Sequence, residues 1–184
     1  MQTNSGGAQT RGVDVELQYS AEPNFFASQE EDFTVRAMVG YLSERSTTSA
    51  AGIYTNFVKR ISTPEYTALA TFNYNIADFG FMLQSTYYDS TLSNGNNEGL
   101  TGPNSNWVEG VDVDDNTVAS QTVFNMGVNY GREMTDGGDW QVGFNVNNLF
   151  DRDPPIIAGA GGQALSNSHQ QFGRTYQLTL NMNF

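Results

Sequence analysis

The sequence predicts an all-β protein, namely an antiparallel up-and-down transmembrane β-barrel segment of about seven strands with long extracellular loops and short periplasmic turns. Three observations predict it: apolar and polar residues alternate in segments of about ten residues, aromatic residues mark the ends of these segments, and short connections alternate with long ones. No run approaches the roughly 18 consecutive apolar residues of a membrane-spanning helix. The mean hydropathy of -0.45 is compatible with membrane strands, because only every second residue of such a strand faces lipid.

The most regular strand is predicted at the carboxyl end, over residues 176–184. Successive side chains of a strand point to opposite faces, so strict alternation gives this strand one apolar and one polar face. An amphipathic last strand that ends on an aromatic residue is typical of bacterial outer-membrane barrels. The apolar face consists of Tyr176, Leu178, Leu180, Met182 and Phe184.

Six further segments alternate in the same way, and their second face is polar or small at nearly every position. In chain order they are residues 13–19, 33–41, 66–74, 79–87, 124–130 and 140–147. Residues 53–61 fit an eighth strand poorly, because Asn56, Lys59 and Arg60 break the period. A soluble β-sandwich would also alternate, so the alternation alone does not decide between the two architectures.

The positions of the aromatic residues favour the membrane barrel. If neighbouring strands are antiparallel, aromatic side chains of the apolar face gather at both ends of the sheet, as the two membrane interfaces require. About 11 residues at ~3.3 Å each, tilted by ~45°, cover roughly the 25 Å of an apolar band. The short connections are 21–32, 76–78 and 132–139, and the long ones are 43–65, 89–120 and 151–173.

The amino-acid composition limits the classes of binding partner that the chain can have. The net charge of -12, from 20 acidic and 8 basic residues, disfavours nucleic acid. The absence of cysteine excludes disulfides and thiolate metal sites. Residues 1–7 lack the features of a signal peptide, which an exported protein needs. Because bacterial single-chain barrels have even strand numbers, seven strands are best explained as the last strands of a larger barrel.

Three segments of the sequence resemble motifs of a known protein family. Residues 146–151 (Val-Asn-Asn-Leu-Phe-Asp) precede Arg152, Asp153 and two prolines, residues 172–184 follow after a loop, and residues 10–17 open the first predicted strand. Together they resemble the TonB-dependent receptors, the 22-stranded plugged transporters of the Gram-negative outer membrane. The resemblance implies that residues 1–184 are the C-terminal portion of the β-barrel, with the plug domain and the TonB box absent from this chain.

The resemblance also implies a function, which is energised uptake of a scarce ligand of the siderophore, cobalamin or oligosaccharide type. The implied partners are outer-membrane lipid, the TonB system acting through the missing plug, and the barrel-assembly machinery, which would read the apolar residues of the last strand as a C-terminal signal. Other possibilities are a small passive outer-membrane barrel or porin-like channel, an outer-membrane enzyme and a soluble carbohydrate-binding sandwich. The acidic loops disfavour a highly anionic ligand.

Candidate site residues are few, and none identifies the ligand. Asp14, Glu16 and Arg36 lie on the polar face of adjacent predicted strands, where they would face the barrel lumen and pair with one another or with the plug. Pro154 and Pro155 are expected to end a strand, and Arg152 is expected to be neutralised by the aspartates beside it.

No catalytic residue and no cofactor are predicted. His169, the one histidine, lacks the positioned nucleophile and carboxylate of a hydrolase, and no G-x-S-x-G sequence occurs. The acidic loop around residue 112 is a weak candidate for Ca²⁺, since it lacks the glycine and distal glutamate of an EF-hand loop. Its candidate ligands are Asp112, Asp114 and Asp115.

Overall fold

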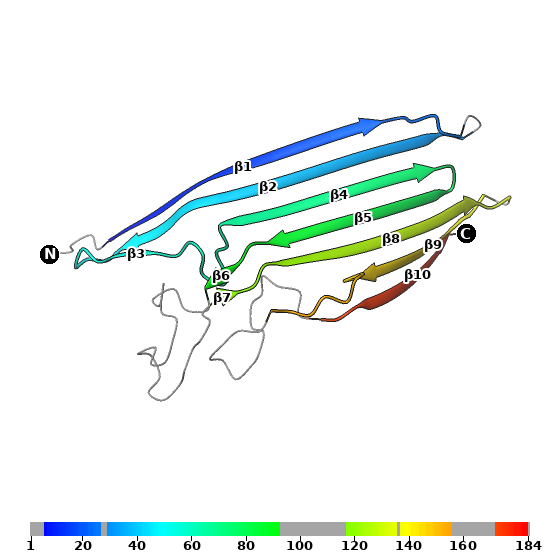
Figure 1. Ribbon diagram of the computed structural model, residues 1–184. Coiled ribbons are helices and arrows are strands. Elements are labelled where there is room, and N and C mark those ends of the chain that lie inside the picture. Colours follow the sequence, from blue (N-terminus) through cyan, green and yellow to red (C-terminus); the bar gives the residue numbers. More distant parts are fainter. Residues whose placement is uncertain (1–5, 27–28, 93–116, 136, 156–171, 184) are drawn as a thin grey trace.

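The protein forms one long antiparallel sheet, shown as a single layer of neighbouring strands in Figure 1. The computed structural model describes residues 6–26, 29–92, 117–135, 137–155 and 172–183. The sheet runs in chain order β1-β2-β4-β5-β8-β9-β10, so each long strand pairs with its neighbours in sequence. The strands are β1 (Gly7–Ala21), β2 (Glu31–Thr48), β4 (Tyr66–Ile76), β5 (Phe79–Tyr88), β8 (Gln121–Glu133), β9 (Asp139–Asn147) and β10 (Thr175–Asn183). All seven predicted strands are confirmed.

The described residues also contain three short strands. β3 (Tyr54–Asn56) pairs with the end of β2, and β6 (Thr91–Leu92) pairs with β7 (Thr117–Val118) in a separate two-stranded sheet. The poor fit of residues 53–61 to an eighth spanning strand is confirmed, because β3 is only 3 residues long and Lys59 adopts a positive φ of 67°. Polar residues at that point direct the chain into a turn.

The register keeps most of the large apolar side chains on one face from the first long strand to the last. One row of paired residues crosses the whole sheet and contains only apolar or aromatic side chains: Tyr19, Val35, Phe72, Leu83, Met126, Val146 and Tyr176. The adjacent row lies on the other face and is polar or small except for one methionine: Ser20, Thr34, Asn73, Met82, Gly127, Asn145 and Gln177. The two faces therefore differ in polarity across the full width of the sheet.

The apolar face is not covered by protein. Among the described residues only Val118, Val123 and Val146 are buried hydrophobic residues, whereas Leu17 and Leu178 are 68% and 73% exposed. A soluble sandwich would bury this face against a second sheet, and the described residues contain no such layer. The described strands therefore have the single-layer arrangement expected of a barrel wall. No helix among the described residues is long and apolar enough to cross a membrane.

Aromatic rings on the apolar face contact one another across strands at both ends of the sheet. At the end with the short connections, Tyr19, Phe33 and Phe72 follow one another at centroid distances of 6.2 and 5.1 Å, and Phe79 lies 4.4 Å from Tyr130. At the opposite end, which we call the long-loop end, Tyr41 stacks on Tyr66 at 5.0 Å. Such cross-strand pairs stabilise the register as well as marking the two edges of the apolar band.

One turn at the short-connection end links three strand pairs. The hairpin between β4 and β5 has only two residues, and Ala77 takes a positive φ of 47° to close it. The Ala77 amide donates to the Glu30 carbonyl at 3.1 Å, while the Asp78 carbonyl accepts from the Gly131 amide at 3.1 Å. Arg132 also reaches the Asp78 carboxylate, with Nε 3.3 Å from Oδ2. The tight hairpin thereby fixes the strands on both sides of it.

The uncovered face yields a stability prediction for the protein in a bilayer. Ala70 lies on the apolar face near the middle of β4, and Asn73 lies on the polar face of the same strand. We expect Ala70→Arg to destabilise the folded protein by roughly 2–4 kcal/mol, the cost of a lipid-facing arginine near the midplane. Asn73→Arg adds the same charge to the polar face and should cost about 1 kcal/mol or less. Urea unfolding in lipid vesicles measures both, and equal losses would contradict the assignment of faces.

Candidate functional site

The charged residues predicted to face the lumen do lie together on the polar face of β1 and β2. The Arg36 Nε atom donates to Glu16 Oε1 at 2.6 Å, and both side chains are about half exposed, at 51% and 46%. Asp14 lies opposite Gly40 and has no ion-pair partner within the described part of the chain. A side-chain carbon at Gly40 would come within 3.0 Å of both Asp14 Oδ1 and Thr67 Oγ1, so glycine leaves the Asp14 carboxylate accessible.

The remainder of the polar face is uncharged over most of its length. From β4 to β10 its described residues are mainly amides, hydroxyls and glycines, and the acidic Glu133 and Asp139 lie only at the short-connection end. Asn125 Nδ2 donates to Gln84 Oε1 at 3.4 Å across the β5–β8 pair. The polar face therefore has a charged part on β1 and β2 and a hydrogen-bonding part beyond it. Such a surface can bind another protein domain or a polar solute.

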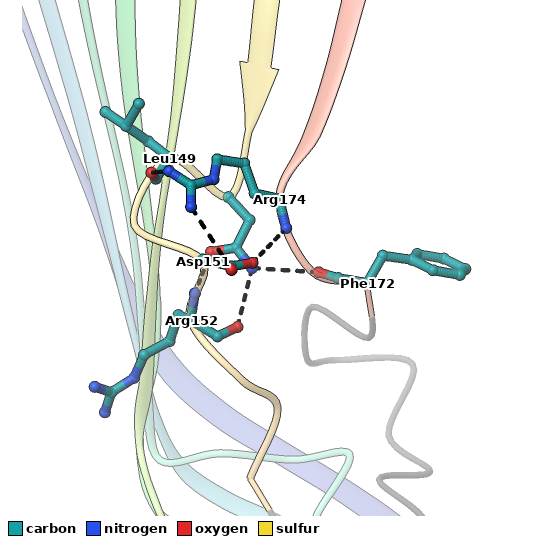
Figure 2. A network of polar contacts seen from close by, with 6 residues as sticks. Leu149, Asp151, Arg152, Phe172 and Arg174 are labelled. Atoms are coloured by element: carbon teal, nitrogen blue, oxygen red, sulfur yellow. Dashed lines mark hydrogen bonds and ion pairs between the residues drawn. The ribbon is translucent and has the colours of Figure 1, made fainter.

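A buried asparagine organises the long-loop end of β9 and β10, as Figure 2 shows for its surroundings. Asn148 is fully buried and has a positive φ of 53°, a conformation that asparagine tolerates better than most residues. Its Nδ2 donates to the carbonyl oxygens of Arg152 and Phe172 at 2.9 and 3.2 Å, and its Oδ1 accepts from the Arg152 amide at 2.8 Å. One side chain thus connects the segment after β9 to the segment before β10.

An aspartate and an arginine make a second connection at the same place. The Arg174 amide donates to Asp151 Oδ1 at 2.7 Å, and the Arg174 guanidinium lies 3.7 Å from Asp151 Oδ2 and 3.4 Å from the Leu149 carbonyl (Figure 2). The expectation that Arg152 is neutralised by both flanking aspartates is not met at Asp151, which forms its ion pair with Arg174. The expectation that Pro154 and Pro155 end the strand is also wrong: β9 ends at Asn147, before the positive-φ turn.

The last strand has the geometry that its sequence predicts. Tyr176, Leu178, Leu180 and Met182 all point to the apolar face and are more than half exposed. Phe184 lies outside the described residues. β10 pairs with β9 along one side and forms an edge of the sheet on the other. Its free edge and exposed apolar side chains are available to a partner strand.

The remaining sequence candidates cannot be placed. Asp112, Asp114, Asp115 and His169 all lie outside the described residues. Within the described ranges, no group of three or more His, Cys, Asp or Glu residues is arranged to hold a metal ion. Sequence reasoning missed the roles of Asn148, Asp151 and Arg174, although an asparagine directly after a strand is a known signal for a positive-φ turn.

The sheet and its motifs agree with the comparison with known proteins. A family model described as TonB dependent receptor-like, beta-barrel, matches residues 1–149. The chain belongs to this family. No curated protein and no solved structure matches the chain. TonB-dependent receptors are receptors and transporters embedded in the Gram-negative outer membrane, so the apolar face of the sheet is the lipid-facing side of a receptor barrel.

The connection between β9 and β10 gives a second prediction for the receptor. Asn148→Ala removes three buried hydrogen bonds and places alanine at a positive φ, and we expect a loss of about 3 kcal/mol in the free energy of unfolding. The matched control is Asn147→Ala, because Asn147 is exposed and makes a single side-chain bond of 3.2 Å to Thr175. Urea denaturation of the detergent-solubilised receptor measures both, and equal effects would refute the assigned role of Asn148.

Proposed function

We propose that residues 1–184 form the C-terminal portion of the β-barrel of an outer-membrane TonB-dependent receptor, whose plug domain and TonB box belong to a preceding part of the same protein. The observation that carries this proposal concerns the described residues: they form a single sheet whose apolar face is uncovered and whose edge strands, β1 and β10, each lack a partner on one side. Unpaired backbone groups in lipid cost several kcal/mol each, so the sheet must close with additional strands. Strands from the preceding part of the barrel would pair with both edges.

The proposed activity is energised uptake of a scarce ligand of the siderophore, cobalamin or oligosaccharide type. Membership of the family supports uptake in general, and the polar face supplies a lumen wall of suitable chemistry. In this proposal Asp14, Glu16 and Arg36 face the lumen and contact the plug. The half-exposed Arg36–Glu16 pair keeps free donor and acceptor positions for that contact.

The last strand has a proposed role in biogenesis. Tyr176, Leu178, Leu180, Met182 and Phe184 form the signal that the barrel-assembly machinery recognises. Support comes from the exposed apolar side chains and free backbone edge of β10, because an exposed strand edge can accept a partner strand by hydrogen bonding. No comparable row of apolar residues at a free edge exists elsewhere in the described chain except on β1.

Uptake by the complete receptor tests the proposed activity. Cells that express it are supplied with radiolabelled ferric citrate, cyanocobalamin or maltooligosaccharides, with and without a functional TonB system. We expect at least one probe to accumulate only when TonB is present, because energy from the inner membrane is needed to displace the plug. Surface binding of that probe should persist without TonB, and an uncoupler should abolish accumulation.

A passive channel would behave differently in the same assay. A small barrel or porin would accumulate the probe equally with and without TonB, and it would show a persistent conductance in a planar bilayer. A plugged receptor should show no persistent conductance. Accumulation that is independent of TonB would therefore refute energised uptake and leave the assignment of the sheet to the membrane unchanged.

A further inference from the structure

The long-loop end of the sheet contains a cleft that neither the charge pattern nor the family assignment predicted. It has a volume of 440 Å³ and lies where β1 and β2 extend beyond the apolar band and meet the turn after β3. Half of the chain's basic residues are concentrated in this region, although the chain as a whole is strongly acidic: Arg11, Arg45, Lys59 and Arg60. Two of them, Arg45 and Arg60, line the cleft.

A β-bulge places Arg45 on the side of the sheet that carries the polar face. Gly12 pairs with Leu42 and Arg11 pairs with Glu44, so Ser43 is an extra residue in β2. The extra residue shifts the alternation by one position. Arg45 therefore points to the polar side with Thr47, while Glu44 points to the opposite side. Without the bulge the arginine would face outward.

The acidic residues close to the cleft are already engaged by other groups. Glu44 accepts hydrogen bonds from Ser46, Tyr54 and Arg11 at 2.8, 3.1 and 2.9 Å, and the Ser46 hydroxyl is the main cause of the lowered pKa of Glu44. Lys59 lies 2.9 Å from Glu65, which raises the pKa of Lys59 through a hydrogen bond and charge attraction. Of the described residues that line the cleft, none is acidic, and Arg45 has no carboxylate partner among them.

One side of the cleft is a turn with several internal hydrogen bonds. The Asn56 side chain accepts from the Val58 amide at 3.1 Å, the Phe57 amide donates to the Arg45 carbonyl at 2.7 Å, and the Thr63 hydroxyl donates to the Phe57 carbonyl. Arg60 lies over the Phe57 ring with its guanidinium carbon 4.6 Å from the ring centroid. These contacts hold the turn in place before any ligand arrives, which reduces the entropic cost of binding.

We propose that this cleft binds a carboxylate or phosphate group carried by a small hydroxylated molecule. The guanidinium of Arg45 offers a planar fork of donors that matches either anion, and Arg60 adds positive charge to the same cleft. Exposed hydroxyls at the rim supply donors and acceptors for the hydroxyl groups of the ligand: Thr10, Thr47 and Ser62. The two charged residues of the described lining are both arginines, so acidic loops elsewhere in the chain do not decide what this cleft binds. This binding site would add detail to the proposed uptake function. It rests on that proposal, because the cleft faces the lumen only if the sheet is part of the receptor barrel.

Calorimetric titration of the complete, detergent-solubilised receptor tests the proposal with three probes: trigalacturonate, glucose 6-phosphate and neutral maltotriose. We expect at least one anionic probe to bind in preference to maltotriose, and the preferred anion identifies the group. Arg45→Gln should weaken that binding by about tenfold or more, and Arg45→Lys should weaken it less. Arg11→Gln is the matched control, because it removes an arginine from the adjacent strand that points to the other side and pairs with Glu44.

Binding by neither anionic probe, or equal weakening by Arg45→Gln and Arg11→Gln, would overturn the proposal. Heat-modifiable gel mobility verifies that each variant is folded, and the exposed position of Arg45 makes a folding defect unexpected. The assay contains no TonB, so it reports on binding and not on energised transport. If the receptor binds the anion but accumulates no probe in a TonB-dependent way, only the proposal of energised uptake is contradicted. If a neutral probe accumulates and no anion binds, only the proposal of anion binding in the cleft is contradicted.

Discussion

The structure depends on one constraint: the face that contacts lipid must be apolar on every long strand, because no other part of the described protein covers it. A shift of one residue in any pairing would turn a complete set of apolar side chains towards the lumen and polar ones towards lipid. The unbroken row from Tyr19 to Tyr176 shows that the constraint is met across all seven long strands. Burial of apolar side chains within the described protein contributes little to stability. The arrangement of this sheet is therefore determined by contact with lipid and not by a hydrophobic core.

Local hydrogen bonds fix the pairing register of neighbouring strands where the alternation of apolar and polar residues alone does not. The two-residue hairpin at Ala77 joins neighbouring pairs at one end, and the buried Asn148 joins β9 to the approach of β10 at the other. The bulge at Ser43 acts differently, since it changes the alternation only beyond the apolar band, where lipid no longer dictates which side is polar. Freedom from the lipid constraint is what allows Arg45 to enter a polar cleft. The position of the bulge beyond the apolar band thus allows the cleft to contain the arginine that would bind the proposed anion.

Much of the fold could be predicted from the sequence, because a two-residue period and its aromatic ends are visible without knowledge of distant contacts. The seven long strands and the pairing region of Glu16 and Arg36 follow directly from it. The turn after β9 could not be predicted in the same way, because Asn148 and Asp151 bond to Phe172 and Arg174, which lie more than twenty residues further along the chain. The local sequence pattern favoured the prolines as the end of the strand instead. The cleft was missed for a related reason, because one extra residue in β2 decides the side to which Arg45 points.

The central claim is that the apolar face contacts lipid, and spin-label accessibility along β4 tests it most directly. The chain contains no cysteine, so single cysteines can be introduced at successive positions from 66 to 74 of the receptor and labelled in lipid vesicles. The account predicts that oxygen, which partitions into lipid, reaches the labels with a two-residue period whose maxima fall at positions 66, 68, 70, 72 and 74. A water-soluble nickel chelate should be excluded at those positions. Uniform accessibility, or maxima at the odd positions between them, would contradict the claim.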